Sequence, residues 1–106
     1  MLLAAGCGEE PSLPSGLAAQ LADRSDAAAE ALEARQFCAA RADAVTLQQR
    51  TIAAVNAGSV PAELQEELLG SVNAVLESIS CTPPRAEDGA AEEARDLADW
   101  LRDRSD

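Results

Sequence analysis

A turn near the middle of the chain reads Val55-Asn56-Ala57-Gly58-Ser59-Val60-Pro61-Ala62-Glu63-Leu64. Gly58 suits the position that follows a helix, where the backbone often turns left-handed. Pro61 suits the first turn of the next helix, and Glu63 places a carboxylate near the positive end of that helix dipole. The stretch therefore predicts two helices that leave a short turn in opposite directions.

The apolar positions on either side of this turn match those of an antiparallel helical hairpin. Facing residues in such a hairpin have position numbers with a constant sum, and both helical faces obey one sum. Smaller residues face larger ones, which allows the two helices to approach closely. The predicted pairs are Ala40 with Ile79, Ala44 with Val75, Leu47 with Val72, Thr51 with Leu68, and Val55 with Leu64.

Two cysteines fit the same register, although neither was used to place the turn. Cys38 faces Cys81 across the open end of the hairpin, so we predict a disulfide between them. In the chain-entropy account, closing a loop of this length contributes about 4 kcal/mol to stability. The alternative is a pair of unpaired buried cysteines that act as small apolar residues.

A further helix is predicted before the hairpin. A break near Arg35-Gln36-Phe37 would let it fold back and bury its apolar stripe, whereas one continuous helix over 16–57 is the alternative. The predicted fold class is therefore all-α: a three-helix bundle over residues 16–81, built on the disulfide-closed hairpin. The stripe consists of Leu17, Leu21, Ser25, Ala28 and Leu32.

The segment 82–106 is predicted to be an acidic tail that carries a fourth, short amphipathic helix. Asp88 could cap a helix from Ala90 to about Arg102. One interpretation is a partly helical, solvated tail, because isolated helices this short are weak. The other is a docking helix that fills a groove on a partner or on the bundle, with Leu97, Trp100 and Leu101 as candidate partner-binding residues.

The composition argues against most catalytic and nucleic-acid-binding functions. Among 106 residues there is no His, and the formal net charge is −11. General acid–base catalysis and zinc binding usually rely on His, and nucleic acids attract basic surfaces. Carboxylate pairs such as Glu63/Glu67 and Glu92/Asp96 are interpreted as solvated helix faces. We expect no enzyme activity, no metal, no cofactor and no nucleic-acid partner.

The N-terminus suggests an exported protein. Leu3-Ala4-Ala5-Gly6-Cys7 resembles a bacterial lipobox, in which the cysteine is lipidated and becomes the first residue of the mature protein. Six residues without a basic one are too short for a signal peptide, so we expect the gene to start upstream of Met1. The interpretation is a residual signal over 1–7 and a flexible tether over 8–15. The alternative is a chance match in an apolar tail.

The body of the chain, from about Leu13 to Pro84, carries Cys38, Val60-Pro61-Ala62-Glu63-Leu64 and Cys81-Thr82-Pro83-Pro84. In this pattern it is similar to small uncharacterised Ala-rich helical lipoproteins and secreted proteins of high-GC actinobacteria. Arg35-Gln36-Phe37 stands where that group has a Gly-Asp turn. The resemblance implies a two-cysteine helical body and carries no implication of activity.

Two functions of different kinds fit these observations. The first is a small structural or protein-interaction module outside the cytoplasm, held at the membrane by lipid on Cys7, with an envelope protein as partner and no small-molecule substrate. The second is a cytoplasmic acidic binding or regulatory protein with reduced cysteines, expected if Met1 is the true start.

Overall fold

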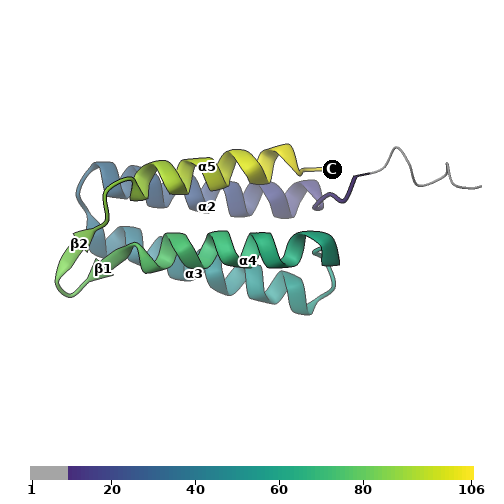
Figure 1. The fold of residues 1–106 in the computed structure, drawn as a ribbon, viewed down its shortest axis with the longest axis horizontal. Helices are drawn as coiled ribbons and strands as arrows, with labels where there is room; N and C mark the ends of the chain where they lie inside the picture. The colour runs from purple at the N-terminus through teal and green to yellow at the C-terminus, as the bar shows by residue number, and fades with distance from the viewer. Residues whose placement is uncertain (1–9) are drawn as a thin grey trace, which may run out of the picture.

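The computed structural model describes residues 10–106, which form a helical bundle with one small hairpin of strands (Figure 1). Helices make up the body, as the Ala-rich composition predicts. The elements in chain order are α2 (Ser15–Glu33), α3 (Phe37–Asn56), α4 (Ala62–Glu77), β1 (Ile79–Cys81), β2 (Pro84–Ala86) and α5 (Ala90–Asp103).

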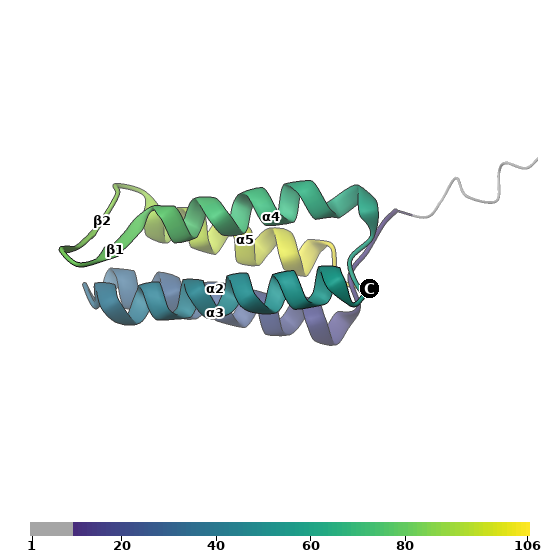
Figure 2. The same cartoon turned by 90° about the horizontal axis from the view of Figure 1, so that it is seen from below.

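The four helices of this part of the chain run alternately up and down, and the contacts between them are unequal. Helix α2 packs extensively against both α3 and α5, and α3 packs against α4. Helices α4 and α5 touch each other much less. Figure 1 shows α2 beside α5, and Figure 2 shows the same bundle from below. The bundle therefore has three tight interfaces and one loose one.

The predicted hairpin of α3 and α4 is confirmed. Gly58 has a φ of 78° and follows the end of α3, and Pro61 directly precedes α4. The predicted facing positions are buried except Val55, which is half-buried. The buried ones are Ala40, Ala44, Leu47, Thr51, Leu64, Leu68, Val72, Val75 and Ile79.

The predicted break between the first two helices is also confirmed. Arg35 adopts a φ of 59°, and the N–H of Gln36 donates to the carbonyl of Ala31 at 2.8 Å. These features end α2 and reverse the chain. Phe37 begins α3 and packs against the core as a half-buried side chain.

The fourth helix belongs to the bundle, which resolves the alternatives for the C-terminal segment. The side chains of Ala94, Leu97, Ala98 and Leu101 are buried in the same core as those of α2. The prediction of a solvated tail is therefore wrong. A helix this short would be weak in isolation, but burial of its apolar stripe against the bundle stabilises it. Gly89, with a φ of 84°, precedes the helix, and the expected side-chain cap from Asp88 is not formed.

Two local features differ from the sequence-based expectation. Helix α4 is followed by the antiparallel strands β1 and β2, which were not predicted. Leu13, placed in the predicted tether over 8–15, is fully buried. Its N–H donates to the backbone carbonyl of Arg104, and its carbonyl accepts from the backbone N–H of Asp106, both at 2.8 Å. The tether prediction is thus wrong at Leu13, because a buried leucine pairs there with the C-terminus.

Candidate functional site

The disulfide lies at one end of the bundle, where it joins the start of α3 to the end of β1. Cys38 and Cys81 are bonded with their Cα atoms 4.5 Å apart, which confirms the predicted pair. Arg41, one turn along α3, donates to the backbone carbonyls of Leu76 at 3.2 Å and Ile79 at 2.7 Å. A guanidinium at the C-terminal end of α4 also suits the helix dipole. A covalent bond and a cation thus fix this end of the hairpin.

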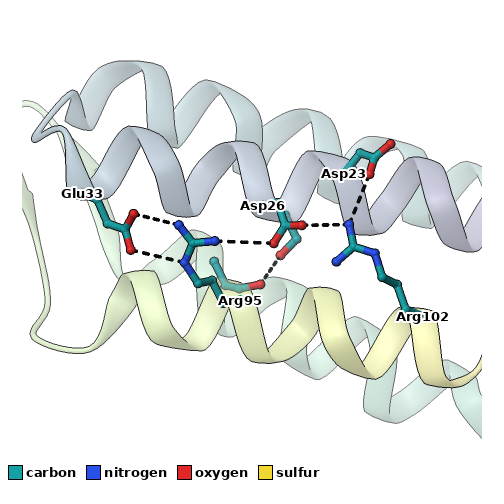
Figure 3. Close-up of polar contacts among 7 residues, drawn as sticks. Asp23, Asp26, Glu33, Arg95 and Arg102 are labelled. Carbon is teal, nitrogen blue, oxygen red and sulfur yellow. Dashed lines mark hydrogen bonds and ion pairs between the residues drawn. The ribbon is translucent and has the colours of Figure 1, made fainter.

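One face of α5 is joined to α2 by arginines (Figure 3). Arg95 makes two hydrogen bonds to the carboxylate of Glu33, the shorter at 2.7 Å, and lies 4.0 Å from Asp26. Arg102 pairs with Asp26 at 2.8 Å and Asp23 at 3.2 Å. Four arginine–acid pairs along one interface orient α5 on α2. We call these five residues the arginine ladder.

The contacts of the ladder shift the pKa values of Glu33, Arg95 and Arg102 in the direction that favours their charged forms. The hydrogen bond from Arg95 lowers the pKa of Glu33 below its ordinary value of 4.5. The same contact raises the pKa of Arg95, and the hydrogen bond to Asp26 raises that of Arg102. All three side chains lie at the surface, so solvent screens these pairs and each contributes little to stability.

The opposite face of α5 borders a groove. This groove lies between α4 and α5, has a volume of about 830 Å³, and is bounded at one end by the segment before α5. From here on we call it the α4–α5 groove. The small side chains on its α4 wall, including Gly70 and Ala74, leave space between the two helices.

Acidic residues line both walls of the groove. No arginine of residues 10–106 is among the lining residues, although the chain contains eight. Like charges on facing helices repel each other, so these carboxylates oppose close packing of α4 and α5, the loosely packed pair. The lining carboxylates belong to Glu66, Glu67, Glu87, Asp88, Glu92, Glu93 and Asp96.

The apolar part of the groove includes Trp100 and the edge of Leu97. Trp100 is half-buried, and the guanidinium of Arg104 lies over its ring, 5.1 Å from the ring centroid. Its indole Nε1 is buried and has no hydrogen-bond partner within residues 10–106. An indole placed between an apolar floor and a charged rim is typical of a protein-binding surface.

The structure separates the three predicted partner-binding residues. Leu101 is fully buried and Leu97 is 4% exposed, so both serve chiefly as core residues. The prediction of a partner surface is wrong for Leu101, because its side chain fills the space between α5 and the rest of the bundle. Leu97 reaches the groove only by its edge, and Trp100 keeps a larger exposed part there. The predicted lipidation residue Cys7 lies outside the described residues.

The groove acids were not predicted as a set. Glu67, Glu92 and Asp96 were interpreted as parts of solvated helix faces, and no contact between α4 and α5 was predicted. The available signal was the concentration of acids beside small residues on both helices. That signal alone does not show which faces meet, because the pairing depends on how α5 docks on α2.

Residues 10–106 contain no group of three or more His, Cys, Asp or Glu side chains arranged to hold a metal ion. None of the helices between these residues combines the length and apolar character needed to cross a bilayer. Comparisons of the chain with models of protein families, with curated proteins and with solved structures found no match.

Proposed function

We propose that this protein is a small, non-catalytic interaction module of the bacterial cell envelope, anchored by lipid on Cys7. The observation that carries the proposal is the Cys38–Cys81 disulfide. Such bonds persist in oxidising compartments and are rare in the cytoplasm. The lipobox-like sequence around Cys7 supports the same location, and the net charge of −11 favours solubility of the helical bundle.

The geometry suits attachment at one end. Leu13 is hydrogen-bonded to the C-terminal residues, and Cys81 of the disulfide belongs to β1, which lies at the end of the bundle opposite the C-terminus (Figure 1). Six residues of chain span at most about 20 Å. Lipid on Cys7 would therefore hold the Leu13 end near the bilayer and direct the disulfide end away from it. Multiple acyl chains would make this attachment firm.

The anchor is tested in the cells that produce the protein. Cells are fed an alkyne-bearing fatty acid, and the native chain is compared with the Cys7→Ser variant by gel shift and membrane fractionation. We expect label and membrane association with the native chain only. Equal labelling of both variants, or no label on the native chain, would contradict the anchor.

The compartment is tested separately by trapping thiols. Cells are quenched in acid, and free thiols are alkylated with a heavy maleimide before and after reduction. We expect Cys38 and Cys81 to react only after reduction, with the Cys38→Ala/Cys81→Ala double variant as the control without these thiols. Free thiols at both positions would instead support a cytoplasmic acidic binding protein.

A further inference from the structure

The α4–α5 interface lacks the polar contacts that join the other neighbouring helices. Arg24 pairs with Asp43 between α2 and α3, Gln48 donates to Asn73 between α3 and α4, and the arginine ladder joins α2 to α5. No side-chain hydrogen bond or ion pair within residues 10–106 joins α4 to α5. Among residues 10–106, the groove is thus where two neighbouring helices face each other without a side-chain polar contact, and its carboxylates are exposed to solvent.

The negative charge of the groove favours a positively charged occupant. The basic residues of α5 that face α2 are already paired in the ladder, whereas the seven carboxylates of the groove have no arginine among their lining neighbours. A cationic partner would gain from all of them and would relieve their mutual repulsion. A second copy of this groove, a nucleic acid or an anionic bilayer would bring further negative charge and be repelled.

The shape of the groove and its apolar residues favour a helix as the occupant. Its walls are two antiparallel helices, and the segment of α5 from Ala90 to Trp100 measures about 15 Å, or about three helical turns. A helix laid between two helices buries an apolar stripe in the groove and presents its flanks to the rim. The half-buried ring of Trp100 and the open space at Gly70 would receive that stripe.

We propose that the α4–α5 groove binds a basic amphipathic helix of a partner protein. The apolar face of that helix covers Trp100 and the edge of Leu97, and its Lys or Arg side chains pair with carboxylates of α4 and α5 such as Glu66 and Asp96. This inference rests on the proposed role as an interaction module and names the chemistry of its partner.

The direct test is a titration of the disulfide-bonded full chain with a synthetic peptide. The probe is a peptide of Leu, Ala and Lys of about 18 residues, long enough to form a helix with one apolar stripe. Trp100 is the only Trp of the chain, and there is no Tyr, so its fluorescence reports on the groove. We expect saturable binding with a shift of the Trp100 emission to shorter wavelength.

Two control peptides separate the helix from its charge alone. One has the same composition in an order that scatters the leucines around the helix, and the other has Glu in place of every Lys. We expect binding at least about tenfold weaker for the scattered peptide, because the apolar stripe is lost. The acidic peptide should not bind. Equal binding of the basic amphipathic and scattered peptides would overturn the proposal.

Matched charge variants locate the binding site. Glu92→Gln/Asp96→Asn removes two groove carboxylates, whereas Asp99→Asn/Asp103→Asn removes two exposed carboxylates of α5 outside the groove. The net charge changes equally, so a general charge effect would affect both variants alike. We expect affinity to fall about tenfold in the first variant and to change little in the second. An equal loss in both would overturn the proposal.

A groove-filling variant tests the site by shape. A Cβ atom at Gly70 would meet nothing within 4 Å, so Gly70→Leu places a side chain in the groove and also favours the helix. Gly16→Leu is the matched control, because Gly16 has equal space and does not line the groove. We expect Gly70→Leu to abolish binding while the circular dichroism spectrum stays helical. Retained binding in a folded Gly70→Leu variant would overturn the proposal.

These measurements fail separately from those of the anchor. If the peptide binds but Cys7 carries no lipid, the groove proposal stands and the lipid anchor is wrong. If Cys7 is lipidated and the peptide does not bind, the anchor stands and the groove proposal falls.

Discussion

Ser25 shows how one small polar residue fixes the contact between α2 and α5. Its side chain is fully buried, and its hydroxyl donates to the backbone carbonyl of Ala94 at 2.6 Å. A larger residue would push the two helices apart. We expect Ser25→Ala to lower the free energy of unfolding by about 1 kcal/mol through the lost hydrogen bond. Ser25→Leu should cost about 1–3 kcal/mol through overpacking.

Urea denaturation followed by circular dichroism checks both Ser25 variants. A neutral Ser25→Leu substitution would show that α5 does not pack closely on α2 at this point. Ser12→Ala provides a control, because Ser12 precedes the first helix.

Glu33 makes the stability of the α2–α5 contact depend on pH. Arg95 lowers the pKa of Glu33 below 4.5 in the folded chain, so this carboxylate favours folding above that pH. Its contribution should diminish as the pH falls below 4.5 and vanish below the folded pKa. We expect native and Glu33→Gln chains to differ in stability near neutral pH and to converge in acid.

The comparison uses urea denaturation of both chains from pH 7 down to about pH 3, with Arg95→Gln as the control that removes the partner. The difference is expected to be small, since the pair lies at the surface. A gap between native and Glu33→Gln chains that widens in acid would contradict the assigned pairing.

At the scale of the elements, the disulfide is the strongest single constraint on the hairpin. It joins residues 43 positions apart and closes the α3–α4 unit opposite its turn. Loop-closure entropy gives about 4 kcal/mol for such a link, a large share of the usual 5–15 kcal/mol of a small domain. We expect Cys38→Ala/Cys81→Ala to unfold at a markedly lower urea concentration than the native chain.

Reduction supplies the check on that prediction. A thiol reductant should lower the midpoint of the native chain and leave that of the double variant unchanged. If the native chain were equally stable with and without reductant, the disulfide would not contribute to stability.

The hairpin of α3 and α4 could be predicted because its information is local. Gly58 and Pro61 mark the turn, and the two cysteines provide an independent check on the register. The break at Arg35 was predictable for a different reason, since a continuous helix would leave an apolar stripe unburied.

The position of α5 was not predictable from such local signals. Its stripe through Leu97 and Leu101 is equally suited to a partner or to the bundle, and only the tertiary contacts with α2 distinguish the two. The strands β1 and β2 have three residues each, too short for a periodic signal. The groove exists only when α5 docks on the bundle, which was one of two open alternatives, so the groove itself was not predicted.

For the whole molecule, the balance of 19 acidic and 8 basic residues makes repulsion the dominant long-range effect. The α4–α5 groove concentrates part of that charge on facing walls, whereas the arginine ladder neutralises part of it between α2 and α5. Salt screens both effects, but the repelling groups outnumber the paired ones. We therefore expect the free energy of unfolding to rise when NaCl is increased from about 10 mM to about 300 mM.

Urea is the suitable denaturant for this measurement because it adds no ions. The triple variant Glu66→Gln/Glu92→Gln/Asp96→Asn should be more stable than the native chain at low salt and should gain less from added NaCl, because part of the repulsion is already gone. Asp99→Asn/Asp103→Asn, which leaves the groove intact, should retain most of the salt dependence. A native chain that loses stability as NaCl rises would mean that the ladder's attraction exceeds the repulsion across the groove, and the explanation for the loose α4–α5 contact would then be wrong.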